Sequence, residues 1–328
     1  MLEHGGRLRR AAERYGRPRA QWLDLSTGIS ALMYPLPALD SADWQRLPEE
    51  DDGLEAAARQ CYGAQSLLPV AGSQAAIQIL PQLLPAQSVA ILAPSYAEHA
   101  HHWQLAGHRL HPFADWTELE ARLPYCAVVV MVQPNNPTGW HAGRERLLAL
   151  HRRLRARGGL LVVDEAFIDP TPQRSLADCS HRDGLVVLRS LGKFYGLAGA
   201  RVGFVCAAPA LLATLRERLG PWPLSGPSRA VARAALSDRV WQVRARRRLR
   251  QDSMRLAHLL GLHGLRPDGG TALFQWVRCD DAAVRHDRLA RLGVLTRLYE
   301  APAALRFGLP GSPDAWRTLA QALAQSAV

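Results

Sequence analysis

A single lysine is the residue of this sequence with the clearest chemical meaning. Of the 40 lysine and arginine residues in the 328-residue chain, only Lys193 is a lysine. It ends the short segment Ser190-Leu191-Gly192-Lys193. A guanidinium stays protonated and is no amine nucleophile, whereas a lysine amine can lose its proton and form a Schiff base. We therefore expect Lys193 to react with a carbonyl group.

Two polar residues precede this lysine at nearly equal intervals. Asn136, Asp164 and Lys193 are separated by 28 and 29 residues, about one strand-helix-strand repeat each time. Each of them follows an apolar run of strand type. Ligands of an open parallel sheet bind outside the carboxyl ends of its strands, so residues just beyond successive strands converge. The spacing therefore predicts that these three side chains line one site.

The middle of the chain alternates apolar runs with helical segments. Strands are predicted at 88–93, 127–132, 160–163 and 185–189, and a helix at 143–157. Unbroken apolar runs of this length imply strands that are covered on both faces. The fold class is therefore predicted to be α/β with a mostly parallel sheet.

Beyond residue 208 the pattern changes to helices with fewer strands. The predicted elements are an arginine-rich helical segment ending near 262, a strand at 272–277, a helix at 281–292, a strand at 294–297 and a helix from 313. We therefore expect a large domain over 41–208, with 1–40 and 209–328 forming an N-terminal arm and a smaller domain.

The amino-acid composition limits which classes of protein this chain can belong to. The apolar share of 48% and the charged share of 21% are ordinary for a soluble globular protein. No apolar run approaches the roughly 20 residues of a membrane span, so a cytoplasmic protein without a membrane partner is expected. The five cysteines are scattered, which favours reduced packing residues and no metal. The net charge of +11 comes from arginines spread over helices, and we expect no nucleic-acid partner.

The polar residues at the strand ends fit one cofactor. Pyridoxal 5′-phosphate needs a lysine for its aldehyde, a carboxylate at its ring nitrogen, an anion pocket and a surface for its ring. Lys193 can supply the amine, and Asp164 can keep the ring nitrogen protonated. Tyr96 can stack on the ring, and Asn136 can donate to its phenolic oxygen. Taken alone, Asp164 could be a helix cap and Tyr96 a core aromatic.

An anion pocket for the cofactor phosphate is predicted from two segments. Gly72, Ser73 and Gln74 open a helix, where free backbone amides can bind a phosphate. Ser190 and Arg201 can complete the pocket. Most Gly-Ser helix starts bind nothing, so this prediction depends on the neighbouring strand ends.

Three segments resemble the signatures of the class I and II aminotransferase fold, which is fold type I of the pyridoxal-phosphate enzymes. They are Asn135-Asn136-Pro137-Thr138-Gly139, Asp164-Glu165-Ala166-Phe167-Ile168-Asp169 and the residues 190–203. The resemblance extends to Leu305-Arg306-Phe307-Gly308, and it implies that Arg306 binds the carboxylate of the substrate. It also implies a large domain with a mostly parallel sheet, a smaller α+β domain and a homodimer.

Two enzyme types within this fold remain open. The resemblance includes histidinol-phosphate aminotransferases and the threonine-phosphate decarboxylases of cobalamin biosynthesis, lyases that convert L-threonine O-3-phosphate to (R)-1-aminopropan-2-ol phosphate. The opening His4-Gly5-Gly6, the segment 23–30 and Phe167 in place of a usual tyrosine favour the decarboxylase. The spacing of the site residues serves either reaction. A cofactor-binding regulator is a third hypothesis, although few residues precede the site motifs to form its DNA-binding domain.

The contacts to a phosphorylated amino-acid substrate are the least defined part of the site. Candidates for its phosphate are Arg297, His4 and Arg7, and each could equally be a solvated surface residue. Arg7 replaces the asparagine that is usual after His-Gly-Gly. Leu47 replaces a tyrosine that often reaches the cofactor phosphate of a partner subunit. These departures leave the predicted cofactor residues intact.

Overall fold

The computed structural model describes residues 3–326. Contacts divide the chain into two compact units. The larger unit comprises Tyr34–Asn136 and His141–Val243. The smaller unit comprises Pro137–Trp140 together with the described residues of Met1–Met33 and Arg244–Val328.

The limits of the larger unit differ from the predicted domain limits at 40 and 208. Helices α8 (Pro209–Leu219) and α9 (Gly226–Ser237) belong to the larger unit by their contacts. Apolar residues of α8 join the core of the large sheet, and Arg229 of α9 binds Asp52 at 2.7 Å. The predicted division into domains at residues 40 and 208 therefore stays a prediction. Residues 1–2 and 327–328, at the two ends of the predicted arm and smaller domain, lie outside the described part.

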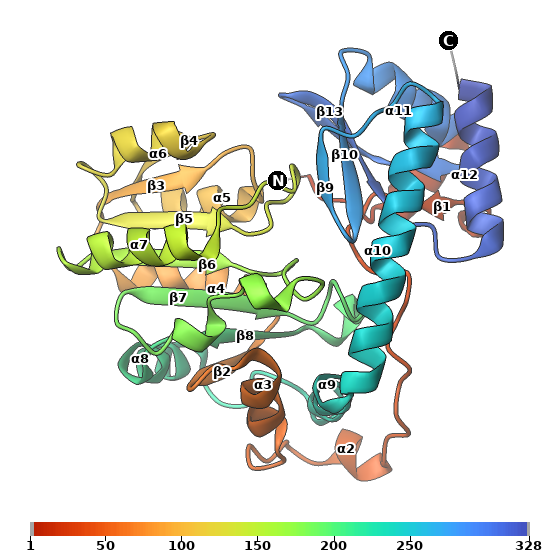
Figure 1. Ribbon diagram of the computed structural model, residues 1–328. Coiled ribbons are helices and arrows are strands. Elements are labelled where there is room, and N and C mark those ends of the chain that lie inside the picture. The colour runs from red at the N-terminus through yellow and green to blue at the C-terminus, as the bar shows by residue number, and fades with distance from the viewer. Residues whose placement is uncertain (1–2, 327–328) are drawn as a thin grey trace. The chain divides into compact units, whose positions relative to one another are not determined.

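A seven-stranded sheet forms the centre of the larger unit, in the order β2-β8-β7-β6-β5-β3-β4 (Figure 1). Its strands are β2 (Leu67–Ala71), β3 (Ser88–Leu92), β4 (Arg109–Phe113), β5 (Val128–Val132), β6 (Leu160–Asp164), β7 (Leu185–Ser190) and β8 (Val202–Cys206). Strand β8 runs antiparallel to both of its neighbours, and the other adjacent pairs are parallel. The prediction of a mostly parallel sheet is confirmed, and β3, β5, β6 and β7 are the four strands expected from the apolar runs.

Helices cover both faces of this sheet. Besides α8 and α9, the helices of the larger unit are α3 (Leu54–Tyr62), α4 (Ser73–Ile79), α5 (Ala97–Leu105), α6 (Trp116–Arg122), α7 (Arg144–Arg155) and α2 (Ser41–Gln45), which packs against α9. Side chains alternate along a strand, and Val128 and Val130 of β5 point into a buried cluster with α4, α5 and α8. Leu147, Leu150 and Leu154 are buried along one side of α7, which lies on the opposite face (Figure 1). Their spacing is that of an amphipathic helix and confirms the helix predicted here.

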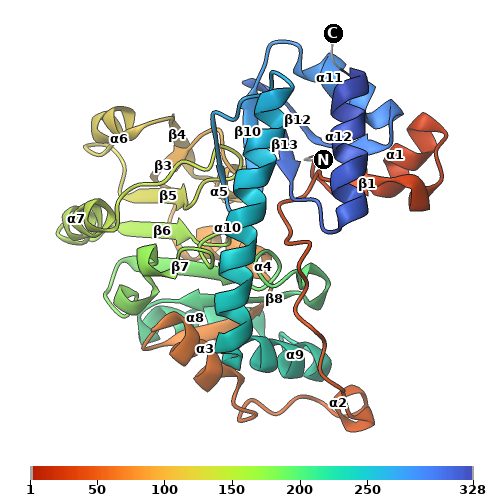
Figure 2. The ribbon, with the colours of Figure 1, turned by 45° about the vertical axis from the view of Figure 1, so that its right-hand side comes forward.

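The smaller unit is built on a four-stranded antiparallel sheet in the order β12-β13-β10-β9. Its strands are β9 (Gly269–Thr271), β10 (Phe274–Arg278), β12 (Arg297–Glu300) and β13 (Ala303–Gly308), and a separate parallel pair joins β1 (Leu23–Asp24) to β11 (Val294–Leu295). Its helices are α1 (Leu8–Tyr15), α11 (Ala282–Arg291) and α12 (Pro313–Ser326) (Figure 2). Trp316, Leu319 and Leu323 form the buried stripe of α12. These mixed elements agree with the predicted α+β character.

The remaining helices connect these elements. Helix α10 (Arg239–Leu262) continues across the limit at 243 (Figure 2). Short 3-10 helices lie at Arg19–Gln21, Leu80–Leu83, Pro172–Arg174, Ala177–Cys179 and Ala198–Ala200. Within residues 3–326, no helix is both long enough and apolar enough to cross a bilayer.

A buried ion cluster lies in the larger unit. Arg189 of β7 is 1% exposed, and its guanidinium binds Asp169 and, at 3.4 Å, Glu165. It also lies 4.1 Å from the ring of Tyr62. Burial raises the pKa of Glu165 to about 7, while the charge of Arg189 opposes that rise. The charge of Arg189 therefore stabilises two buried carboxyl groups at once, and each member of the cluster depends on the others.

Replacing the arginine of this cluster should destabilise the fold strongly. Arg189→Met leaves Asp169 and Glu165 buried without their cation, which should lower the free energy of unfolding by about 3 to 5 kcal/mol. Urea denaturation measures this change. The matched control is Arg216→Met, since Arg216 pairs with Glu50 at 2.7 Å while both side chains are about half exposed. The control should lose less than about 1 kcal/mol, and equal losses in the two variants would contradict the prediction.

Candidate functional site

A cavity of about 110 Å³ lies in the larger unit at the carboxyl ends of its parallel strands. Asp164 is the last residue of β6, Ser190 is the last residue of β7, and Asn136 follows β5. The cavity is lined by the predicted residues Ser73, Gln74, Tyr96, Asn136, Asp164, Ser190, Lys193 and Arg201. Gly72 does not line it but lies directly against Arg201. The structure thus brings the predicted cofactor residues together, while their individual roles stay predictions.

The carboxylate of Asp164 is buried at the end of β6, where only 2% of the residue is exposed. His99 Nε2 lies 2.9 Å from Asp164 Oδ2, and the backbone N–H of Ala166 donates to Oδ1 at 3.0 Å. A buried carboxylate is costly unless it is paired in this way. His99 was not predicted from the sequence. The signal for it was its position three residues after Tyr96, the residue directly before α5, which is about one helical turn away.

Two glycines allow a guanidinium and a helix start to come close together. Arg201 has a φ of 54°, which is unusual for a residue with a side chain. A Cβ on Gly72 would lie 2.7 Å from Arg201 Nη2, and a Cβ on Gly203 would lie 2.4 Å from the backbone N of Ser73. Glycine at both positions therefore lets Arg201, the first turn of α4 and strand β8 pack against one another.

A chain of hydrogen bonds runs along one wall of the cavity. Tyr96 donates its hydroxyl to Gln74 Oε1 at 3.1 Å, and Gln74 Nε2 donates to Glu98 Oε2 at 2.9 Å. His102 Nε2 lies 3.1 Å from the same Glu98 oxygen. Burial, with a smaller effect of Glu98, raises the pKa of Tyr96 to about 12, so its phenol stays neutral and can donate. The side-chain amide of Gln74 is thus engaged at both ends.

The lysine lies beside an apolar ring. Lys193 Nζ is 5.6 Å from the ring centre of Phe167, which also lines the cavity and is 4% exposed. An aromatic face at this distance attracts an ammonium. On another wall, Asn135 accepts from Ser95 at 2.8 Å and donates to the carbonyl of Pro94 at 2.9 Å. These bonds hold the loop that carries the neighbouring residue, Asn136.

The smaller unit holds two predicted substrate-binding arginines on adjacent strands. Arg306 of β13 is 5% exposed, donates to the carbonyl of Ser26 at 2.7 Å and lies 5.2 Å from the ring centre of Phe274. Its pKa is lowered by burial and also by Arg297. Arg297 of β12 stands directly opposite Arg306 in the antiparallel register and donates to the carbonyl of Glu3 at 2.7 Å. Like charges at opposed positions repel, so this pair favours a bound anion.

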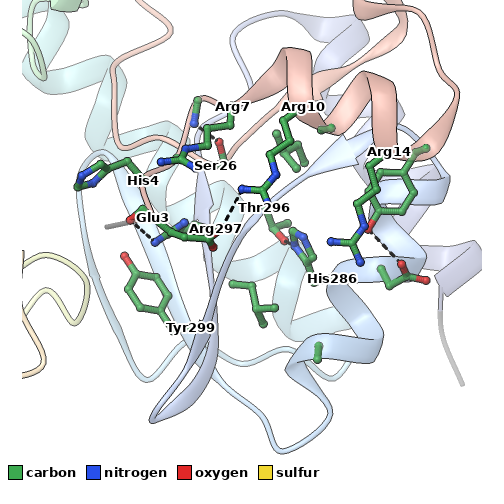
Figure 3. Close-up of a pocket in the computed structure, with 18 of the residues that line it drawn as sticks. Glu3, His4, Arg7, Arg10, Arg14, Ser26, His286, Thr296, Arg297 and Tyr299 are labelled. Carbon is green, nitrogen blue, oxygen red and sulfur yellow. Dashed lines mark hydrogen bonds and ion pairs between the residues drawn. The ribbon is translucent and has the colours of Figure 1, made fainter. Parts of the chain in front are cut away.

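A pocket of about 660 Å³ adjoins these strands in the smaller unit (Figure 3). Its lining includes the predicted residues His4, Arg7 and Arg297, and also Arg10, Arg14 and His286, which the sequence analysis did not select. Arg306 is not part of this lining, but Ser26, its hydrogen-bond partner, is. Leu47 belongs to the larger unit and is 65% exposed.

The chain is similar in sequence and in fold to several known proteins. The sequence model of the family described as aminotransferase class I and II matches residues 38–323. A threonine-phosphate decarboxylase of Pseudomonas aeruginosa is 55% identical, covering 98% of this chain and 97% of that protein. Another, from a Sinorhizobium species, is 42% identical over 99% of this chain and 98% of that protein. A solved histidinol-phosphate aminotransferase from Sinorhizobium meliloti, in complex with pyridoxal-5′-phosphate, has a TM-score of 0.85 at 23% identity, covering 99% of this chain and 95% of that chain, which is a likeness of fold.

Gly203→Ala should disturb the cavity wall that Arg201 and Ser73 share. The added Cβ would meet the backbone N of Ser73 at 2.4 Å, so β8 and α4 would have to separate, at a cost of about 1 to 3 kcal/mol in unfolding free energy. The control is Gly199→Ala in the segment just before β8, where an added Cβ meets nothing within 4 Å. Thermal unfolding compares the two, and a Gly203→Ala variant as stable as the control would argue against this close packing.

Proposed function

Because the chain belongs to the aminotransferase class I and II family, we propose that it is a pyridoxal-phosphate-dependent threonine-phosphate decarboxylase. Its substrate would be L-threonine O-3-phosphate, and its product would be (R)-1-aminopropan-2-ol phosphate, in cobalamin biosynthesis. The observation that carries this proposal is the 55% identity to the Pseudomonas aeruginosa decarboxylase along nearly the full length of both proteins. The groups gathered in the cavity of the larger unit support the same cofactor.

The polar groups of the cavity match the three functional ends of pyridoxal phosphate. The guanidinium of Arg201, with Ser73 and Ser190, would hold its phosphate, since cations and hydroxyls are the usual donors to a dianion. The buried carboxylate of Asp164 would bind its ring nitrogen. Lys193 would bind its aldehyde carbon. One cation for an anion, one anion for a basic nitrogen and one amine for a carbonyl make a complementary set.

The chemistry requires an acceptor for the electron pair of the broken carbon-carbon bond. When bound, pyridoxal phosphate supplies a ring that withdraws electrons from Cα of an attached amino acid. Asp164 would keep a proton on the ring nitrogen, and His99 would hold that carboxylate in place at 2.9 Å. Lys193 would return a proton to Cα after carbon dioxide has left. Tyr96 and Asn136 would hold the plane of the ring.

The substrate carries two anionic groups, and the smaller unit offers arginines for both. We assign the carboxylate of the substrate to Arg306, as the family resemblance implies. The phosphate of the substrate is assigned to Arg297 with His4, because Arg297 stands beside Arg306 in the sheet and lines the pocket with His4. An arginine binds either group through two parallel hydrogen bonds.

A cytoplasmic homodimer completes the proposal. The family resemblance implies this assembly. Three large apolar side chains near the start of the larger unit support a partner surface, since Leu36, Trp44 and Leu47 are 59%, 71% and 65% exposed. Large apolar side chains that are exposed in a single chain can be covered at a protein interface.

The single lysine makes the attachment of the cofactor directly testable. After incubation with pyridoxal phosphate and reduction with borohydride, mass spectrometry should find a pyridoxyl group on the peptide that contains Lys193. The Lys193→Ala variant should carry no such group, because no other side-chain amine is present in the sequence. Label found only at the N-terminal amine of the wild-type protein would refute the assignment.

Turnover without an acceptor separates decarboxylation from transamination. Given L-threonine O-3-phosphate and no keto acid, the enzyme should release carbon dioxide over many turnovers, because reprotonation at Cα returns the cofactor unchanged. For threonine, which has no phosphate, kcat/KM should be lower by a factor of about ten or more for each charge-assisted phosphate contact that is lost. Transamination of histidinol phosphate with 2-oxoglutarate, without any carbon dioxide from threonine phosphate, would establish the aminotransferase instead.

A further inference from the structure

Helix α1 and the residue before it carry a row of arginines along the pocket of the smaller unit. Arg7 directly precedes the helix, Arg10 and Arg14 are four residues apart on one side of it, and all three line the pocket. Figure 3 shows Arg10 and Arg14 leaving this helix on the same side, with Arg7 near its start. With a rise of about 1.5 Å per residue, the row extends roughly 10 Å along the helix axis.

A polar wall stands across from this row. His286 of α11 shares a hydrogen bond with Thr296 at 2.8 Å, which fixes the orientation of its ring. Burial lowers the pKa of His286, Arg14 and Arg297 lower it further, and Asp287 acts in the opposite direction. The imidazole is therefore neutral at neutral pH and can still donate one hydrogen bond.

Three carboxylates line the pocket, and of these Glu300 is exposed. Asp287 accepts from the hydroxyl of Tyr15 at 3.0 Å and from Arg291 at 2.8 Å. Glu3 pairs with Arg10 at 3.2 Å, but the two side chains are 64% and 66% exposed. Such an exposed ion pair contributes little free energy, so a stronger anion can displace it.

The remaining cations outnumber what the substrate requires. The substrate phosphate is assigned to Arg297 and His4, which leaves the row on α1 and His286 without a role in the proposed reaction. A single phosphate is too small to reach every guanidinium along a row of about 10 Å, whereas a chain of two or three phosphates has the length and charge to do so. The pocket volume of about 660 Å³ lies in the range of small-molecule sites.

We propose that Arg7, Arg10, Arg14 and His286 form a second anion site that binds a ligand with adjacent phosphate groups, such as an inorganic polyphosphate or a nucleoside triphosphate. In the absence of the ligand, the carboxylate of Glu3 pairs with Arg10 and occupies part of the site. This inference rests on the proposed function in one respect, the assignment of the substrate phosphate to Arg297 and His4, and it concerns binding alone.

Calorimetric titration of the cofactor-loaded enzyme tests the site. Inorganic tripolyphosphate should bind at least about tenfold more tightly than inorganic phosphate at the same ionic strength, because it pairs with more guanidinium groups. Equal affinity for the two anions would overturn the proposal. In a parallel titration, tighter binding of ATP than of tripolyphosphate identifies the nucleotide as the ligand class, and weaker binding identifies the bare phosphate chain.

Two variants with opposite expected effects on tripolyphosphate affinity test whether the anion binds at this pocket. Arg14→Gln should weaken tripolyphosphate binding about tenfold, and Glu3→Gln should strengthen it because the competing carboxylate is gone. The charge-matched control is Arg317→Gln on α12, an exposed arginine paired with Asp314, and it should keep wild-type affinity. Equal weakening by Arg14→Gln and Arg317→Gln would reduce the effect to net charge and would overturn the site. Carbon dioxide release from threonine phosphate, measured separately, reports on the proposed reaction alone.

Discussion

The burial of one carboxylate constrains most of the cavity in the larger unit. Asp164 ends a strand with both faces covered and is only 2% exposed, so its carboxyl group needs hydrogen-bond partners within the protein. That requirement brings His99 of α5 against the end of β6 and turns the next residues so that the N–H of Ala166 points back to the carboxylate. Tyr96 directly precedes the helix that supplies His99, and so the pairing of one acid also constrains where the aromatic wall of the cavity stands.

Glu165, the residue after Asp164, is a second buried acid that needs a partner, and it finds a different one. Glu165 is also fully buried, but it pairs with Arg189 in the cluster that includes Asp169. Two neighbouring acids thus have separate partners, and the strand end that carries them is held from two directions. This division suits a site in which one carboxylate is available to a ligand while the other holds the backbone. Such double anchoring limits how far Asp164 can move when a ligand arrives.

The convergence of the predicted cofactor residues on one cavity could be foreseen because they follow strands at regular intervals, and that regularity is a property of the chain alone. Asn136, Asp164 and Lys193 reach one cavity for this reason. The partners of the cavity residues were not identified from the sequence, since His99 pairs with Asp164, and Glu98 with Gln74, through contacts between segments far apart in the chain. Arg10 and Arg14 were not selected from the sequence, because their meaning depends on the concave wall that only the fold supplies. The limit of the larger unit at 243 likewise follows from packing of α8 and α9, which no change in composition marks.

The reversed strand β8 has a consequence for how such a site can change during evolution. A parallel strand presents only its end at the ligand edge, and a long crossover separates it from the next strand. Because β8 runs the other way, its beginning lies at that edge, and a single short connection, residues 191–201, carries both Lys193 and Arg201. The amine of Lys193 and the guanidinium of Arg201 therefore belong to one β-hairpin connection. An insertion or deletion in this connection would change the distance between the two groups without moving any helix that connects the parallel strands.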